Sequence, residues 1–255
     1  MLAERETWPN APVSVQLAED EAHVWCASLE QSSSRVEACW NALAPDERER
    51  AGRFRYEKDR RRFIIARGVL RDILGRYLKC PPAQVSFSYN QYGKPALSYE
   101  NEDVRLRFNM SHSHEVALYA LTREREVGVD VEWLREDFAS SEIAERFFSR
   151  REVVLLGGLA PGLRTDGFFN CWTRKEAYIK ALGEGLSHPL DRFAVSLAPG
   201  DPARFLSIDD DPREIERWSL VELHPSEGYA AALVTEGIMR ELRCWKWMGL
   251  VVSQD

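Results

Sequence analysis

The sequence predicts an α+β fold built from two similar halves. Segments in which apolar and polar residues alternate, as they do in strands, are mixed along the chain with longer segments of helical spacing. Each half begins with a strand, continues with helices and ends with further strands. The halves share this order of elements rather than a repeated sequence. We therefore expect an N-terminal α+β subdomain at residues 1–122 and a C-terminal α+β subdomain at residues 123–255.

The first half is predicted to contain five strands and two helices. Alternation predicts strands at residues 13–18, 22–29, 85–90, 104–110 and 115–122. A helix is expected at residues 32–43, ending before Pro45. A long arginine-rich helix is expected at residues 48–79, because apolar residues recur there at helical spacing until Pro81 and Pro82 stop it.

The second half has the same kinds of element. Alternation predicts strands at residues 127–134, 192–197, 217–223, 228–235 and 242–247. Helical spacing predicts helices at residues 140–149, 149–156 and 168–182. Ser149 and Glu152 have the spacing of a capping box, and the glycines of residues 183–185 suit the end of the last helix. Residues 198–205 and 209–214 have the composition of turns.

Composition limits the classes of function. The chain has 255 residues and a formal net charge of −7, which argues against a general nucleic-acid binder. No apolar run is long enough to span a bilayer, and the first residues lack the pattern of a signal peptide. The five cysteines are scattered, without metal-binding or redox spacing. We expect a cytoplasmic protein with reduced thiols that binds neither nucleic acid nor membrane.

One stretch of this acidic chain is strongly basic. Residues 48–79 are dense in arginine. Local positive charge of this kind suits a phosphate-rich small ligand or an acidic protein partner. A solvated helix face explains the same charges, so the stretch alone does not decide between the two interpretations.

Two carboxylates are predicted to lie on one face of a strand. In the segment Gly-Val-Asp-Val-Glu, Asp130 and Glu132 are two residues apart and therefore point the same way. Such carboxylates repel each other unless a proton or a cation lies between them, and Mg²⁺ prefers oxygen ligands of this kind. An edge strand with polar outer positions would show the same pattern.

A third carboxylate lies on the apolar side of the helix at residues 168–182. Glu176 falls between Phe169, Trp172 and Ile179, where a carboxylate loses hydration and needs a partner. A metal shared with the strand would supply that partner. The lysines beside it, Lys175 and Lys180, would then hold phosphate groups bound to the same metal. The alternative is a rim helix on which Glu176 simply pairs with Lys180.

Two polar turns complete the candidate site. Ser111, His112 and Ser113 end a strand and combine hydroxyl groups, an imidazole and turn amides, as anion sites do. Lys94 follows a flexible glycine and precedes Pro95, which would hold it on a rigid turn. Each segment taken alone is also typical of an ordinary turn.

These motifs follow one another in a specific order. The arginine-rich helix precedes Gly-Lys-Pro, then Phe-Asn-x-Ser-His-Ser, Gly-Val-Asp-Val-Glu and Trp-x-x-Lys-Glu-Ala-x-x-Lys-x-x-Gly-x-Gly. In this order the chain resembles the 4′-phosphopantetheinyl transferase superfamily, in its large, single-chain, pseudo-duplicated Sfp type. The motifs span residues 45–190, and the last two form the most specific pair.

The resemblance implies a fold, an activity and a cofactor. Members of the family fold as two similar α+β halves with the active site at their interface. They transfer the 4′-phosphopantetheine arm of coenzyme A to a serine of an apo acyl or peptidyl carrier protein, and they release 3′,5′-ADP. They require Mg²⁺. The carriers serve fatty-acid, polyketide or nonribosomal peptide biosynthesis.

The resemblance also implies the site residues. By position, the metal ligands are Asp130, Glu132 and Glu176. The matching coenzyme A contacts are Arg50, Arg62, Lys94, Pro95, Ser111, His112, Lys175 and Lys180. Lys94 and Pro95 match the loop at the adenine, and Ser111 and His112 match the contacts to the phosphates.

The chain departs from the family pattern at one position. Glu47 stands where some relatives carry a basic residue for the nucleotide. Binding of the 3′-phosphate is therefore expected to rest on Arg50, Arg62 and Arg53.

The expected mechanism agrees with what phosphoryl transfer requires, which is charge neutralisation and in-line positioning. The nucleophile comes from the carrier, and this chain has no nucleophile elbow of its own. Lys180, Lys175 and His112 would donate hydrogen bonds as charge develops. Glu176, directly or through a metal-bound water, is the candidate to accept the serine proton, so Glu176 and Lys180 are the expected catalytic residues.

Two other functions would use the same residues. One is a Mg²⁺-dependent phosphohydrolase or nucleotidyl transferase that acts on another donor. The other is a non-catalytic nucleotide-binding scaffold. The sequence identifies neither the carrier nor the surface on which it docks. Because one chain already contains two halves, we expect a monomer.

Overall fold

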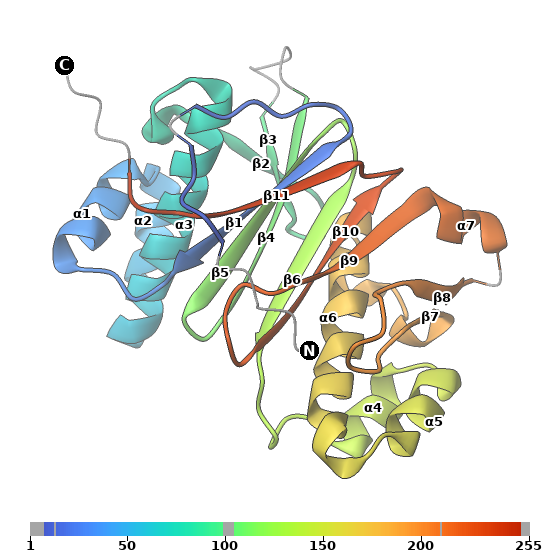
Figure 1. Cartoon of the computed structure of the whole chain (residues 1–255). Helices are drawn as coiled ribbons and strands as arrows, with labels where there is room; N and C mark the ends of the chain where they lie inside the picture. Colours follow the sequence, from blue (N-terminus) through green and yellow to red (C-terminus); the bar gives the residue numbers. More distant parts are fainter. Residues whose placement is uncertain (1–7, 13, 99–104, 210, 251–255) are drawn as a thin grey trace.

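The computed structural model describes residues 8–12, 14–98, 105–209 and 211–250. Two sheets lie next to each other in the middle of the molecule (Figure 1). Helices of the first half pack against one sheet, and one long helix of the second half packs against the other. This architecture confirms the predicted α+β class.

The first sheet has four strands. They are β1 (Glu21–Ser28), β4 (Leu106–Ser113), β5 (Val116–Arg123) and β11 (Glu241–Lys246). Their order is β11-β1-β5-β4, with β11 parallel to β1 and the other pairs antiparallel. Trp25, Phe108 and Tyr119 point to the face that helix α3 (Glu57–Leu78) covers.

The second sheet is antiparallel, in the order β6-β10-β9. Its strands are β6 (Val127–Trp133), β9 (Trp218–Leu223) and β10 (Tyr229–Glu236). Helix α6 (Arg164–Leu182) packs against one face of this sheet. Two small hairpins add β2 (Phe87–Tyr89) with β3 (Pro95–Leu97), and β7 (Phe193–Val195) with β8 (Phe205–Ile208).

The other helices surround these layers. They are α1 (Ser33–Ala42), α2 (Pro45–Gly52), α4 (Ser141–Phe147), α5 (Arg150–Gly158) and α7 (Pro212–Arg217). Short 3₁₀ helices span Pro82–Gln84, Pro161–Leu163, Gly185–Ser187 and Leu190–Arg192. Ser149 and Glu152 form the predicted capping box, and Gly183 ends α6 with φ 77°, a left-handed conformation that favours glycine.

The structure corrects the sequence-based elements at five places. The expected helix at residues 48–79 is two helices, because the chain leaves α2 after Gly52, a poor helix former, and starts α3 at Glu57. Of the strand expected at residues 13–18, residue 13 lies outside the described residues and residues 14–18 form no strand. The expected turn at residues 209–214 contains α7, whose first turn Asp211 caps. Strands β3 and β8 were not predicted.

An apolar cluster joins the two sheets. Small and branched side chains from the first sheet, such as Ala22, Val24 and Leu118, pack against Val129 of β6 and Leu233 of β10. All five are fully buried, so the halves share one continuous interior. Within the described residues, no helix is both apolar enough and long enough to cross a membrane.

The last strand of the chain belongs to the first sheet. Strand β11 pairs with β1 from Glu21–Glu241 to Cys26–Lys246. The chain therefore returns to the first half after completing the second. The division at residues 122 and 123 stays a prediction.

A histidine lies in the core of the first sheet. His23 is fully buried, and its Nδ1 lies 2.7 Å from the Tyr77 hydroxyl, which accepts a hydrogen bond from Trp25 Nε1 at 3.0 Å. The Tyr77 hydroxyl then donates to Nδ1, which leaves the imidazole neutral with its proton on Nε2, 3.3 Å from Glu21. Burial lowers the pKa of His23 well below its ordinary value, and the Glu21 carboxylate offsets part of that effect.

We expect this histidine to make folding stability sensitive to acid. In the unfolded chain His23 takes up a proton below about pH 6.5, whereas the folded chain resists it, so stability is lost as pH falls. The loss approaches about 1.4 kcal/mol per pH unit at most. Urea unfolding at several pH values should show a steeper loss for the wild type than for His23→Asn. Parallel curves for the two proteins would contradict this assignment.

Candidate active site

The candidate site lies where strand β4 of the first sheet meets strand β6 of the second. Side chains of β4 accept hydrogen bonds from the backbone of β6, as the backbone of a neighbouring strand would. Asn109 Oδ1 accepts a hydrogen bond from Val129 N at 3.0 Å, and Ser113 Oγ accepts one from Trp133 N at 3.1 Å. Alternate residues of β4 thus fix the register between the halves.

Helix α6 comes unusually close to β6 at Gly128. A Cβ atom at this position would lie 2.0 Å from the Ala177 carbonyl oxygen and 2.4 Å from Ala181 N. Only glycine permits such an approach of backbone to backbone. The two contacted alanines directly follow Glu176 and Lys180 along the helix, so the contact holds both side chains against the strand that carries Asp130.

Asp130 is the centre of a buried polar cluster. Its side chain is 3 % exposed. Oδ1 accepts hydrogen bonds from Lys180 Nζ at 2.6 Å and from Ser111 Oγ at 2.7 Å, and Lys180 also lies 2.9 Å from Ser111 Oγ. Three elements, β4, β6 and α6, therefore converge on one carboxylate. Its second oxygen, Oδ2, is buried without a hydrogen-bond partner.

The two other predicted carboxylates interact with Asp130. Burial raises the pKa of Glu176 to about 7, with further contributions from the charges of Asp130 and Glu132 and an opposing one from Lys180. Burial and the Asp130 charge also raise the pKa of Glu132, although Ser113 Oγ donates to Glu132 Oε2 at 2.7 Å. The site thus gathers more negative charge than its own lysine neutralises.

These residues fit a divalent cation in their chemistry. The orphaned Oδ2 of Asp130 and the mutual repulsion of Asp130, Glu132 and Glu176 are what a hard cation would relieve. Within the described part of the chain, no three acidic, histidine or cysteine side chains are already close enough together to enclose a metal. In this arrangement the Lys180 ammonium lies beside Asp130 instead.

Helix α6 is buried almost all around, which revises the expected position of Glu176. Phe169 and Ile179 are indeed buried. Beyond the exposed first turn, however, Trp172, Glu176 and Lys180 form the least buried stripe of the helix, one turn apart from each other. Glu176 therefore faces the seam between the halves rather than the apolar core.

His112 points to the other side of β4. It alternates with Ser111 and so shares a face with Met110, which packs toward α3. Burial lowers the pKa of His112, and the charges of Lys180 and Arg62 lower it further. Two cationic side chains thus act on this imidazole, and an anion would be attracted to such a place.

Lys175 is a correction to the sequence-based site. Its ammonium group is fully buried, forms a 2.8 Å ion pair with the fully buried Glu152, and donates to the carbonyl oxygens of Leu190 and Phe193. It has no access to a ligand. It joins α5 and α6 to the segment that runs from Leu190 into the start of β7, because a buried ammonium needs such partners.

Lys94 and Pro95 lie on the predicted hairpin, where Gly93 has φ 82°. The Lys94 ammonium is engaged by the protein: it donates to the Ala181 carbonyl at the end of α6 at 3.1 Å and to Glu126 at 3.3 Å. Burial lowers its pKa, and Glu126 opposes that effect. The hairpin of the first half is thereby attached to the helix that carries Glu176.

The structure shows why an acidic residue stands at position 47, where some relatives carry a basic one. It is 3 % exposed and accepts hydrogen bonds from Arg67 Nε and Arg71 Nε, both at 2.5 Å, and from Ala44 N at 3.0 Å. This carboxylate thus connects α2 to α3 through the two arginines. Beside it is a cavity of about 280 Å³, lined by Asp46, Glu47, Arg50, Phe63, Arg67 and Tyr89.

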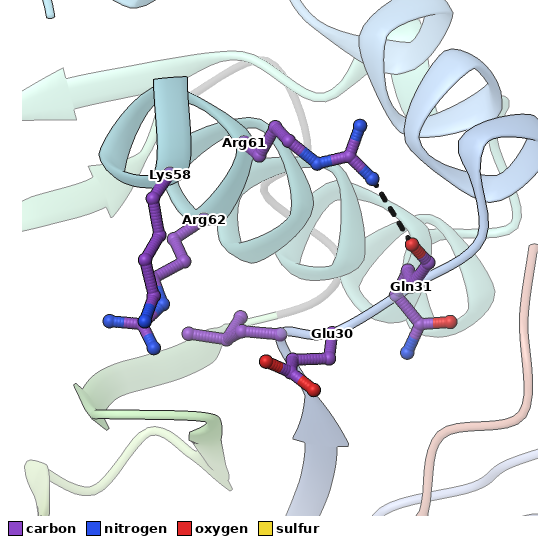
Figure 2. A pocket seen from close by; sticks show the side chains of 6 residues that line it. Glu30, Gln31, Lys58, Arg61 and Arg62 are labelled. Carbon is purple, nitrogen blue, oxygen red and sulfur yellow. Dashed lines mark hydrogen bonds between the residues drawn. The ribbon is translucent and has the colours of Figure 1, made fainter. Parts of the chain in front are cut away.

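Arg50 and Arg62 were predicted together, but they line different cavities. Arg50 lies in the cavity beside Glu47, whereas Arg62 lines a second one with Leu29 and Gln31 (Figure 2). The sequence analysis named Ser113 only as part of a polar turn and gave Asn109 no role, whereas Ser113 bonds Glu132 and Asn109 bonds the β6 backbone. These two residues alternate with Ser111 along the strand, and this spacing could have predicted that all three share one face.

Comparison with known proteins identifies the family of the chain. Residues 126–234 match the family model of the 4′-phosphopantetheinyl transferase superfamily, and residues 27–124 match the model described as 4′-phosphopantetheinyl transferase, N-terminal. The 4′-phosphopantetheinyl transferase HetI of Nostoc sp. is 37% identical over 95% of this chain and 99% of its own length. Sfp of Bacillus subtilis strain 168 is 33% identical over 65% of this chain and 71% of its own.

A solved structure is also similar. It is a holo-(acyl-carrier-protein) synthase from Bacillus anthracis in complex with CoA (3′,5′-ADP), 23% identical, with a TM-score of 0.36 over 44% of this chain and 96% of that one. The similarity to HetI over nearly the full length of both chains establishes the family. Both family models name the same family. The chain belongs to the 4′-phosphopantetheinyl transferase superfamily.

Proposed function

We propose that the protein transfers the 4′-phosphopantetheine arm of coenzyme A to a serine of an apo carrier protein and releases 3′,5′-ADP. The observation that carries this proposal is the convergence of Asp130, Glu132, Glu176 and Lys180 at the seam, in a chain that matches HetI over nearly its whole length. Both sides of the seam come from one chain, so a monomer suffices.

The basic residues of the site are assigned to binding the phosphates, and Glu176 is assigned to proton transfer. Lys180 contacts Ser111 and can donate to the diphosphate of coenzyme A, whereas His112 lies on the other face of β4, where its imidazole would meet a more distant phosphate oxygen. Arg50 and Arg67 line the cavity beside the hairpin, which suits the 3′-phosphate near an adenine at Lys94 and Pro95. Glu176 lies on the open stripe of α6 and is our candidate to accept the proton of the carrier serine.

Asp130, Glu132 and Glu176 are the residues that would hold Mg²⁺. When bound there, the cation neutralises the charge of the diphosphate. Lys180 would then release Asp130 and turn to the phosphate oxygens, which accept the same hydrogen bonds. Ser113 keeps the Glu132 carboxylate directed into the seam through its 2.7 Å hydrogen bond.

Mass spectrometry of the carrier tests the proposal. The protein is incubated with coenzyme A, Mg²⁺ and a panel of apo acyl and peptidyl carrier proteins. We expect the mass of at least one carrier to increase by that of the phosphopantetheine group, with 3′,5′-ADP as co-product. Release of the nucleotide without a heavier carrier would instead indicate a phosphohydrolase, and binding of coenzyme A without any product would indicate a scaffold.

Replacing Lys180 by alanine should weaken coenzyme A binding. The Lys180 side chain is 27% exposed, and its ammonium contacts Asp130 and Ser111. The proposed site of the diphosphate is next to this contact. Loss of one charge-assisted contact corresponds to about a tenfold rise in the dissociation constant. Isothermal titration with coenzyme A measures it, with Lys79→Ala on the far end of α3 as control. Equal affinities for wild type and Lys180→Ala would remove Lys180 from the binding site.

A further inference from the structure

The last turn of helix α6 receives two hydrogen bonds from the first half of the chain. Asn90 Nδ2 donates to the Gly183 carbonyl at 3.0 Å, and Lys94 Nζ donates to the Ala181 carbonyl at 3.1 Å. Both donors lie on the turn of the β2–β3 hairpin. The final carbonyl groups of a helix have no partner within the helix, so the hairpin supplies donors that the end of α6 needs.

The Lys94 ammonium also reaches the start of strand β6. Nζ lies 3.3 Å from Glu126 Oε2, and Glu126 directly precedes the strand. The Lys94 side chain is 19% exposed, and a Cβ atom at Gly183 would lie 3.2 Å from Lys94 Cδ, so its methylene groups pack against the end of the helix. A carboxylate and the negative end of a helix dipole are the partners that such an enclosed ammonium needs.

The turn that the hairpin holds is the turn that carries Lys180. Ala181 directly follows Lys180, and its backbone nitrogen faces β6 closely at Gly128 while its carbonyl accepts the hairpin ammonium. Two contacts therefore fix the backbone from which the Lys180 side chain extends. Its ammonium then lies 2.6 Å from Asp130 Oδ1 and 2.9 Å from Ser111 Oγ.

The two hairpin donors approach the helix as one unit. Asn90 Oδ1 accepts hydrogen bonds from Lys94 N at 2.8 Å and from Tyr92 N at 3.0 Å, and Asn90 N donates to the Lys94 carbonyl at 3.1 Å. The Asn90 side chain thus closes the turn with its oxygen and reaches α6 with its nitrogen. A turn closed in this way holds the Lys94 backbone in one place relative to the helix.

We propose that Lys94 is a positioning residue, whose ammonium holds the last turn of α6 so that Lys180 reaches Asp130 and Ser111. This inference rests on the proposed transferase function, in which Lys180 donates to the diphosphate. It gives the Lys94 ammonium a role distinct from the adenine contact expected of this turn. Hydrogen bonds weaken steeply with poor geometry, so a displaced Lys180 binds the diphosphate less well. A residue that acts in this way has no effect once Lys180 is removed.

A double-mutant cycle tests the proposal. Lys94→Met keeps the methylene groups and removes the ammonium, and titration with coenzyme A in the presence of Mg²⁺ gives the dissociation constant. We expect Lys94→Met to raise this constant about fivefold in the wild type but less than about 1.5-fold in Lys180→Ala, because residues of one network are coupled. Lys79→Met makes the same chemical change at an exposed residue after α3 and should alter neither value.

Amide hydrogen exchange of the ligand-free protein gives a second measurement. In Lys94→Met the amides of residues 180–183 should exchange about tenfold faster than in the wild type, because the end of the helix opens more readily. Asn90→Asp keeps the acceptor that closes the turn and removes the donor to Gly183. It should reproduce both the faster exchange and the dependence of coenzyme A affinity on Lys180, and it decides the matter if Lys94→Met does not fold.

The outcomes separate this role from the alternatives. An equal loss of coenzyme A affinity in the wild type and in Lys180→Ala would overturn the proposal and make the Lys94 ammonium a direct contact of the nucleotide. Unchanged exchange at the end of α6 would also overturn it. If the wild type neither binds coenzyme A nor modifies any carrier, the proposed function itself fails, whereas the exchange measurement still shows whether Lys94 holds the helix.

Discussion

Glu176→Gln should reduce phosphopantetheine transfer by at least about 100-fold at saturating coenzyme A and carrier, because loss of one preorganised charged group at a transition state costs on that order. The amide keeps the shape of the side chain but removes its charge, its capacity to accept the serine proton and most of its affinity for a divalent cation. The carrier mass shift, followed in time at fixed Mg²⁺, measures the rate.

The same change should not weaken the fold. Burial and the charges of Asp130 and Glu132 raise the pKa of Glu176 to about 7. At pH 8 the wild-type carboxylate is therefore ionised, although its surroundings disfavour the charge. A neutral amide avoids that repulsion, so the metal-free variant should melt no lower than the wild type. Asp166→Asn, an exposed acid at the start of the same helix, is the control with normal transfer. Full activity in a folded Glu176→Gln protein would exclude the assigned role.

Gly128→Ala should destabilise the protein by about 3 kcal/mol or more, since an added methyl group without space forces the backbone to move. The new Cβ would meet the Ala177 carbonyl oxygen at 2.0 Å and Ala181 N at 2.4 Å. Neither is a flexible side-chain end, so α6 must shift away from β6. For a chain of this size, thermal melting should fall by roughly 6–12 °C.

The displaced helix carries the site with it. Glu176 and Lys180 lie on the turns that contact Gly128, so the folded fraction of Gly128→Ala should also transfer more slowly than the wild type. Gly157→Ala on α5 is the matched control, because no atom lies within 4 Å of its added Cβ and alanine favours a helix. A melting temperature equal to the wild type would show that the close approach at Gly128 is not needed.

The sequence predicted those features that depend on local periodicity. Alternation placed Asp130 and Glu132 on one face of a strand, and the structure has them on β6 with Val129 and Val131 buried behind. Capping at Ser149 and the stop of α6 at Gly183 were also local signals that the structure confirms. The α+β class follows from the same patterns.

What the sequence could not supply depends on contacts between distant segments. A helix buried almost all around gives no single apolar stripe, so the side chains of α6 could not be sorted by periodicity. Lys175 therefore appeared to be available for phosphate, although its partner Glu152 on α5 encloses it. The role of Glu47 was hidden for the same reason, since Arg67 and Arg71 approach it from another helix.

The parallel pairing of β1 with β11 determines when the first half can finish folding. Its sheet lacks one edge strand until the second half has been synthesised. The pairing that begins at Glu21 and Glu241 can therefore form only at the end of synthesis. Contacts so far apart in the chain raise the contact order and slow folding. During translation the exposed edge of β1 would offer unpaired backbone groups to other chains. Chaperone demand in the cell should accordingly be set by this late closure rather than by the catalytic seam.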